Sequence, residues 1–443
     1  MNRPAITAWR APTLAAAFGA AITLFVFWPG LMSVDSAVQF AQARGVVPWD
    51  DVHPVLMAAL WRATDAVCAG PGGLFALFVL AWWAGLACWA GQWRTTAWRR
   101  VMLVLVVGFW PASFLMLGHV WKDVGMSAAL LLASAFCLQW HRGRGGWSRV
   151  AALVFLFVAC GFRHNAAAAA LPILIWLLWP KPTQARQWSL RLAGLVVLAG
   201  LMAATPGLIA QTAGATQRHA WTVVALWDLA ALSITSEQVK LPASVLAGPP
   251  LTVAELRQHF DPWANPRLYE VGKIKSSFFH DYSDTQLAEV RAAWWQAVRE
   301  DPNAYLQHRW RLARHLLFGF EVELPRELIY VPQRIVLPVT PIALAAVDES
   351  NFVWRGAAAL RCTPLFAGAS YLLLAVLAGL LACRRLQGPA RAAVGALAAS
   401  AWANALPLLL ISGSAEFRYL TWTVLASVLA AALVLAGERR EIG

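Results

Sequence analysis

Ten apolar segments, most of them long enough to cross a bilayer, set the strongest limit on how this chain can fold. A helix needs about 20 apolar residues to cross about 30 Å of hydrocarbon. Only 13% of the 443 residues are charged, whereas an ordinary soluble chain is about a quarter charged. We therefore predict an all-α polytopic membrane helical bundle. The expected spans are 11–32, 72–93, 101–119, 124–140, 150–162, 166–179, 190–210, 364–383, 392–411 and 417–436.

The fifth and sixth of these segments are short, and Arg163, His164 and Asn165 separate them. A single span across both segments would place Arg163 inside the bilayer at a cost of about 3 kcal/mol or more. We therefore interpret them as two spans joined by a tight turn.

The distribution of basic residues predicts the orientation of the bundle. The net charge is +13, and Lys and Arg favour cytoplasmic loops. If the N-terminus is cytoplasmic and the spans alternate, the cytoplasmic segments hold 16 of the 36 Lys and Arg residues, but only Glu438 and Glu441 among the acids. The basic excess is then a topology signal, so we expect no nucleic-acid partner, and both termini are predicted to be cytoplasmic. The cytoplasmic segments are 1–10, 94–100, 141–149, 180–191, 384–391 and 437–443.

Three regions follow from this topology. Residues 1–210 form a transmembrane core with a first outer loop at 33–71, and residues 362–443 form the C-terminal spans. Between them, 211–361 is an outer segment large enough for a small domain. No Gly-rich nucleotide-binding pattern occurs in it.

The outer segment is predicted to be mostly helical. Thr252 to Glu255 and Ser283 to Gln286 have the capping-box pattern, and Asp301 before Pro302 predicts a third helix start. In that third helix, apolar residues such as Trp310 alternate with arginines, which is typical of a helix that lies on a membrane surface. The stretch 324–350 is expected to be irregular.

The first outer loop carries the first group of candidate site residues. Asp35 and Gln39 are four apart and would share a helix face, and Asp35 beside a span end can act as a general base. The alternative for Asp35 is a helix N-cap. Further on, Asp50, Asp51 and His53 could bind a cation or a phosphate-bound metal, or could form a turn before the next helix.

Three further outer links place charged groups at span ends. Lys122 can pair with a phosphate, and Asp123 can be a second catalytic or metal-binding carboxylate; the alternative is an interfacial anchor and a helix cap. Arg163 offers a guanidinium fork to a phosphate, or a favourable charge at a helix C-terminus. Near the last span, Arg418 either binds an anion or pairs with Glu416.

One outer face therefore collects carboxylates at 35, 51 and 123 and cations at 122, 163 and 418, with Tyr419 at the same level. Cations suit a phosphate headgroup, a carboxylate suits deprotonation of a sugar hydroxyl, and aromatic rings suit sugar stacking. We infer a phosphate-linked lipid substrate and glycosyl transfer in which the lipid phosphate leaves. Asp228 interrupts the apolar stretch 220–232, and the sequence alone does not place it.

The motifs that carry these residues also resemble those of a known group of enzymes. Val34-Asp35-Ser36 with Gln39, Asp51-Val52-His53-Pro54, Trp121-Lys122-Asp123, Arg163-His164-Asn165 and Phe417-Arg418-Tyr419 resemble, in their order and their common outer face, the bacterial GT-C membrane glycosyltransferases.

This resemblance implies a GT-C-like bundle in a bacterial inner membrane and a polyprenyl-phosphate sugar donor used on the periplasmic side, with a glycan or lipid as acceptor. It implies Asp35 and Asp123 as catalytic acids and Lys122, Arg163 and Arg418 as donor phosphate ligands. Ser36 follows Asp35 where the commonest pattern has Glu after Asp, which leaves the need for a divalent cation open. The residues expected to position the acceptor or a cation are Gln39, Asp51, His53, His164, Asn165 and Tyr419.

Two other functions fit the same features. An O-antigen polymerase or ligase would use a diphosphate-linked oligosaccharide and needs similar outer cations. A lipid-linked sugar transporter or flippase would instead place charges near the membrane midplane and repeat one half of the chain in the other, and the sequence has neither feature.

Overall fold

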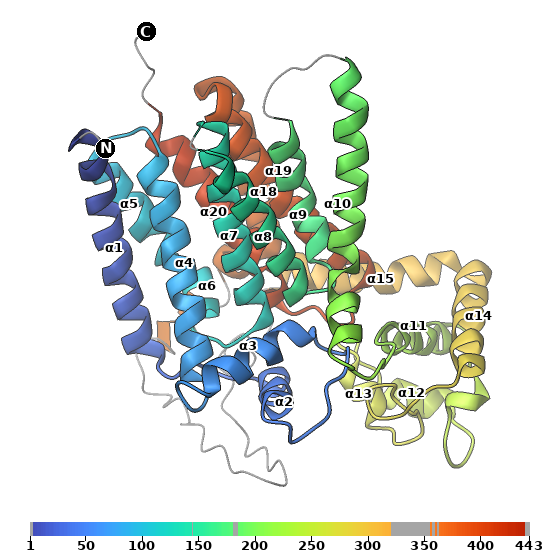
Figure 1. The fold of residues 1–443 in the computed structure, drawn as a ribbon. Coiled ribbons are helices and arrows are strands. Elements are labelled where there is room, and N and C mark those ends of the chain that lie inside the picture. Colours follow the sequence, from blue (N-terminus) through green and yellow to red (C-terminus); the bar gives the residue numbers. More distant parts are fainter. Residues whose placement is uncertain are drawn as a thin grey trace.

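The computed structural model describes residues 3–143, 145–179, 185–319, 355–356, 359–360 and 363–438, and within these ranges it forms helices but no β-strand. Seven of the helices in these ranges are long and apolar enough to cross a membrane, and there are eight if a bent pair is counted as one span. This confirms an all-helical bundle of multi-pass membrane type (Figure 1). The seven are α1 (Arg3–Phe27), α4 (Gly72–Gln92), α7 (Lys122–His141), α10 (Ala185–Thr212), α18 (Gly368–Arg385), α19 (Gly388–Ile411) and Phe417–Ala436, which ends in α20 (Thr421–Ala436).

The prediction of ten spans is not confirmed, although a helix lies at each predicted position. The expected straight span 101–119 consists of α5 (Ala97–Gly108) and α6 (Pro111–Leu117), bent by 65°. Pro111 lacks a backbone N–H, so it ends one helix and opens the next. α8 (Gly146–Phe162) and α9 (Ala166–Leu178) are separate helices, as predicted, but each is shorter than a full span.

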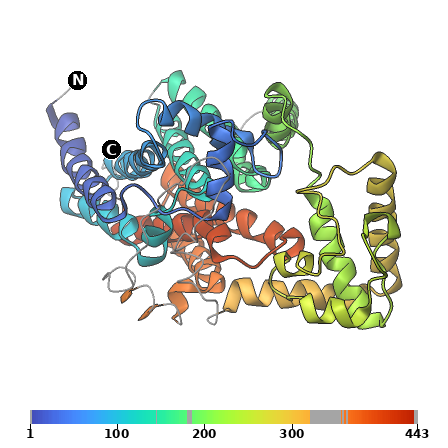
Figure 2. The same ribbon diagram turned by 90° about the horizontal axis from the view of Figure 1, so that it is seen from below.

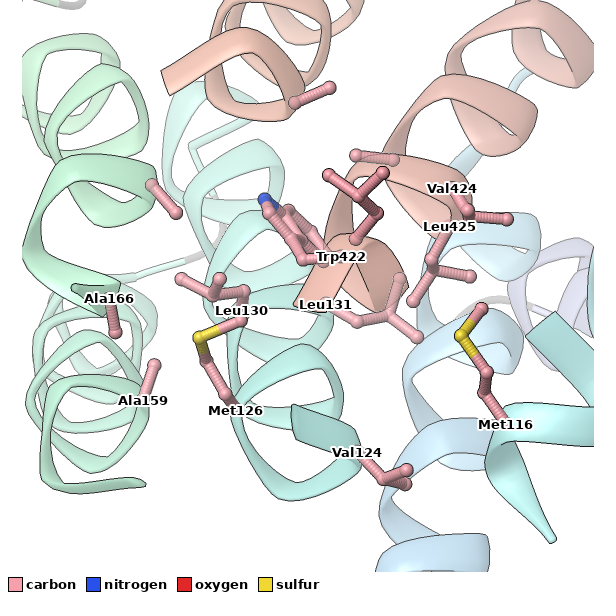
Figure 3. Close-up of a cluster of buried hydrophobic side chains, with 14 of the residues drawn as sticks. Met116, Val124, Met126, Leu130, Leu131, Ala159, Ala166, Trp422, Val424 and Leu425 are labelled. Carbon is pink, nitrogen blue, oxygen red and sulfur yellow. The ribbon is translucent and has the colours of Figure 1, made fainter. Parts of the chain in front are cut away.

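The core of the bundle is centred on α7. In the apolar part of α7, 83% of the residues are buried, against 11% for the peripheral α10, whose apolar residues are mostly left uncovered by the rest of the chain. Side chains of α7 such as Met126 and Leu130 meet Trp422 of α20 (Figure 3). The indole Nε1 of Trp422 donates to Ser400 Oγ on α19 at 2.8 Å, so the polar atom of this buried indole is paired.

The first outer loop folds into α2 (Val34–Ala43) and α3 (Val55–Asp65), at the end of the bundle opposite the start of α1 and the end of α20 (Figure 1). Leu31 holds the start of α2 beside the start of α7: its N–H donates to Gly118 O at 2.9 Å, and its carbonyl accepts from Val120 N at 2.8 Å. These two bonds bring residue 35 next to residue 122.

The described part of the outer segment lies to one side of the same end of the bundle (Figure 2). Both predicted capping boxes are present, and Asp301 accepts from Ala304 N at 2.9 Å, so these three predictions are confirmed. The stretch 324–350 lies outside the described residues. The helices of this segment are α11 (Trp221–Ser236), α12 (Val253–His259), α13 (Pro266–Tyr269), α14 (Asp284–Glu300) and α15 (Pro302–Phe318).

Asp228, which the sequence did not place, anchors this segment from within. It is buried on α11, and its carboxylate accepts from Arg309 Nη2 at 2.6 Å and from Trp294 Nε1 at 2.8 Å. Arg309 also donates to the carbonyl of Ser412 at 2.8 Å, just past the end of α19. The outer segment is therefore fixed to the link that precedes the last span.

Candidate functional site

A cavity of about 340 Å³ opens at this end of the bundle, where the first outer loop, three span ends and the outer segment meet. One wall is apolar and is built from α11, α19 and residue Phe278. The charged groups line the rest of the cavity. The polar and charged side chains that line it are Asp35, His53, Lys122, Arg163, His164, Asn165, Asn265, Ser412, Ser414, Glu416, Arg418 and Tyr419.

Arg418 links two carboxylates in this cavity. Its Nη2 donates to Asp35 Oδ2 at 2.9 Å, and its Nε donates to Glu416. Burial by itself would raise the pKa of both carboxyl groups, but the charge of Arg418 outweighs burial, and the pKa of each lies below its usual range. Both groups are therefore ionised at neutral pH. The remaining nitrogen of Arg418, Nη1, is buried and has no hydrogen-bond partner among the described residues.

Lys122 and His53 form a second pair. The ammonium of Lys122 donates to His53 Nδ1 at 2.8 Å, so the neutral ring carries its proton on Nε2, which lies 3.9 Å from Asp35 Oδ1. Burial, helped by the charge of Lys122, lowers the pKa of His53 to about 3. His53 is therefore uncharged at neutral pH, and the carboxylate nearest to Lys122 is Asp35, at 3.9 Å.

Arg163 reaches the cavity from the break between α8 and α9. Behind the cavity wall it pairs with Asp123, which is fully buried. In front, its guanidinium lies over the ring of Tyr419 at 4.5 Å. Tyr419 in turn donates to Glu416 Oε1 at 2.8 Å. The chain of contacts fixes the direction of Arg163, because a guanidinium held on both sides has little freedom to turn.

The structure brings most of the predicted site residues together. Asp35, His53, Lys122, Arg163, His164, Asn165, Arg418 and Tyr419 all line the cavity.

Three predicted residues lie behind this lining. Asp123 holds Arg163. Gln39 is buried and donates to the backbone carbonyl of Asp35 at 3.0 Å. Asp51 accepts from the backbone N–H of Arg218 at 2.6 Å, and its own carbonyl lies 3.2 Å from His164 Nε2. All three support the wall and do not face the cavity.

The structure also tests the purely structural alternatives for Asp35 and Arg418. Asp35 is not the N-cap of α2, because Ser33 caps that helix through a capping box with Ser36. The ion pair between Glu416 and Arg418 is present, but Arg418 additionally binds Asp35. An ion pair and a site role are therefore compatible at this position.

Glu416 and Asn265 were not predicted as site residues. Glu416 was read only as a partner for Arg418, yet it is the second carboxylate of the lining. Its position two residues before Arg418, at a span end, was the available signal. No sequence signal marks Asn265, because it belongs to the outer segment and reaches the cavity only through the fold. Its Nδ2 donates to Gly413 O at 2.9 Å.

A divalent cation was left open by the sequence. Across the parts of the chain that the structure describes, no three His, Cys, Asp or Glu side chains come together to hold a metal ion. The two lining carboxylates face Arg418, and Asp123 faces Arg163.

Fold and site together define a multi-pass helical membrane protein with a cation-rich cavity at one end of its bundle. Comparison of the chain with protein-family models, with curated proteins and with solved structures finds no match. The cavity is therefore the feature of the molecule from which a function can be inferred.

Proposed function

We propose that this protein is a bacterial inner-membrane glycosyltransferase that moves a sugar from a polyprenyl-phosphate donor to a glycan or lipid acceptor on the periplasmic side. One observation carries the proposal: the carboxylate of Asp35 stands beside Lys122 and Arg418 in a cavity at the span ends. The start of α1 and the end of α20 lie together at the opposite end (Figure 1), as expected if both termini are cytoplasmic.

The donor phosphate would bind between Lys122 and Arg418, with Arg163 at its side. Lys122 donates to a neutral imidazole and has its nearest carboxylate at 3.9 Å, and Arg418 keeps a buried nitrogen without a partner. A phosphate oxygen would satisfy both groups with charge-assisted hydrogen bonds. The same cations would stabilise the charge that develops as the lipid phosphate leaves.

Asp35 would accept the proton of the acceptor hydroxyl. In the reaction, the acceptor oxygen forms a bond to the anomeric carbon, and the bond from that carbon to the phosphate oxygen breaks. The electron pair leaves with the polyprenyl phosphate, and the hydroxyl proton goes to Asp35. A bound phosphate competes for Arg418 and adds negative charge near Asp35, so it raises the pKa of this carboxyl. Asp35 would thus become a stronger base only when the donor is bound.

The apolar wall supports a lipid substrate. Leu408 and Ile411 line the cavity, and α19 continues from them with exposed Leu406 and Leu410, which gives a lipid tail a path to the bilayer. A volume of about 340 Å³ lies near the lower limit of small-molecule sites. This size favours one sugar unit over the oligosaccharide that a polymerase or ligase would bind.

The test is transfer from a panel of polyprenyl-phosphate hexoses and pentoses to membrane glycolipid acceptors by purified wild type and Asp35→Asn. We expect transfer by wild type and a loss of at least about 100-fold in Asp35→Asn, the usual range for a general base. Asp65→Asn is the matched control, because Asp65 belongs to the same loop and pairs with Arg44 outside the cavity. Equal transfer by wild type and Asp35→Asn would contradict the assignment of the base.

A further inference from the structure

Helix α15 has an exposed face that combines large apolar side chains with arginines. Leu306, Trp310 and Phe318 are 58%, 59% and 48% exposed, and Arg311 and Arg314 are exposed on the same side. The other side of the helix is buried, because Arg309 and its neighbours pack against α11, α18 and α19. Apolar side chains of this size are seldom left in water on one face of a helix without a partner.

Two contacts fix the height of α15 relative to the spans. Arg309 donates to Ser412 O, directly after the last residue of α19. Gly368, the first residue of α18, packs on Leu316, so that a Cβ added there would lie 3.0 Å from the Leu316 carbonyl oxygen. One span ends and another begins at this level. The helix therefore lies where the hydrocarbon of the membrane meets its headgroups.

The direction of α15 and of its exposed face shows how this helix is oriented relative to the membrane plane. The helix runs across the direction of the spans, and α11 lies below it in the view of Figure 1, on the side away from the end of the bundle that holds the start of α1 and the end of α20. α11 covers this lower side of α15, and α18 and α19 cover the side next to the bundle, so the exposed side faces the level of the bilayer. A helix in the membrane plane with apolar side chains toward the acyl region and arginines beside them is a typical interfacial helix.

We propose that the exposed face of α15 docks on the lipid bilayer, with a preference for anionic lipid. Leu306, Trp310 and Phe318 insert at the boundary of headgroups and acyl chains, where Trp is enriched. Arg311 and Arg314 extend their charged ends to lipid phosphates. The contact fixes the outer segment over the membrane, and it does not depend on the proposed function.

The test places a bimane label on this face in full-length protein whose native cysteines have been replaced. Leu306→Cys and Trp310→Cys carry the label on the face, and both side chains are exposed, so the core is undisturbed. Thr285→Cys is the matched control, because Thr285 is exposed in the first turn of α14. This helix is 17 residues long; its last turn adjoins α15, and its first turn lies below the level of α15 in Figure 1. Each labelled protein is reconstituted in nanodiscs that contain acyl-chain nitroxide lipid.

We expect the nitroxide lipid to quench the labels at 306 and 310 at least about twofold more than the label at 285, because an interfacial helix buries its apolar face about 5–10 Å into the boundary. Discs with phosphatidylglycerol should quench more strongly than discs of phosphatidylcholine, and Arg311→Gln with Arg314→Gln should remove that difference. Equal lipid quenching at 306, 310 and 285 would overturn the docking. So would protection from aqueous iodide without lipid quenching, which would indicate a protein cover. Equal quenching in both lipids would overturn the anionic preference.

Discussion

Arg418 Nη2 lies 2.9 Å from Asp35 Oδ2, although the two residues are 383 positions apart in the chain. This bond closes the first outer loop onto the start of the last span. Arg418 also holds Glu416, so a single guanidinium keeps two half-buried carboxylates ionised. The same guanidinium is the group that we expect an anionic substrate to bind, which couples the stability of this end of the bundle to ligand binding.

Arg418→Gln should therefore destabilise the protein. Removal of one partner from a fully buried ion pair costs about 3–5 kcal/mol. Arg418 is 9% exposed, but the Asp35 and Glu416 side chains are 28% and 27% exposed and Asp35 keeps Lys122 nearby, so we expect a loss at or below the lower end of this range. Thermal unfolding in detergent measures the effect. Arg418→Lys should be intermediate, because a single ammonium cannot hold both carboxylates as the guanidinium does. Arg44→Gln, which breaks a surface pair with Asp65, should cost no more than about 1 kcal/mol; equal losses in the two Gln variants would refute the prediction.

The sequence was sufficient for the helices and for the end of the bundle at which the site lies. Capping boxes, Pro positions and apolar lengths are local signals, so the helix starts at Thr252, Ser283 and Asp301 were predicted. The bend at Pro111 was missed, because the apolar pattern continues through it.

The sequence could not predict how each helix is rotated about its own axis, and this limited the prediction of the site. A span that is apolar on all sides gives no preferred face. The sequence therefore could not tell that Asp123 points away from the cavity while Lys122, its neighbour, lines it. The pairing of Asp35 with Arg418 depends on that same packing of distant helices.

His53 should make stability depend on pH. Its pKa is about 3 in the folded protein and 6.5 in the unfolded chain, chiefly because of burial. Below pH 6.5 the unfolded state binds a proton that the folded state does not, so stability falls as pH falls. Between pH 7 and pH 5 the loss from this group is about 2 kcal/mol at most.

Thermal unfolding at pH 7 and pH 5 tests this dependence. His53→Gln should lose less stability than wild type over this range, because the variant has no proton to bind at this position. His280→Gln, which changes an exposed histidine, should behave like wild type. An unchanged pH dependence in His53→Gln would show that the imidazole is not held neutral.

Asp123→Asn should separate binding from chemistry. Asp123 pairs with Arg163 from behind the cavity wall, so loss of its charge loosens a phosphate ligand and leaves Asp35 in place. We expect KM for a polyprenyl-phosphate sugar to rise about tenfold with little change in kcat, the signature of lost uniform binding. Asp35→Asn should instead lower kcat. If Asp123→Asn lowers kcat as far as Asp35→Asn does, then Asp123 takes part in the chemistry, as the sequence suggested.

Gly125→Ala should displace Arg163 through packing alone. A Cβ at Gly125 would lie 2.7 Å from Phe162 Cε1, and Phe162 directly precedes Arg163, so either the Phe162 ring or the end of α8 must shift. Overpacking of this kind costs about 1–3 kcal/mol, and we expect weaker donor binding together with a lower unfolding temperature. Gly200→Ala is the matched control, because that helical glycine has no atom within 4 Å of an added Cβ and Ala favours the helix by up to about 1 kcal/mol. Titration with polyprenyl phosphate and thermal unfolding of both variants measure the two effects. Unchanged affinity and stability in Gly125→Ala would mean that the contact between α7 and α8 does not set the position of Arg163.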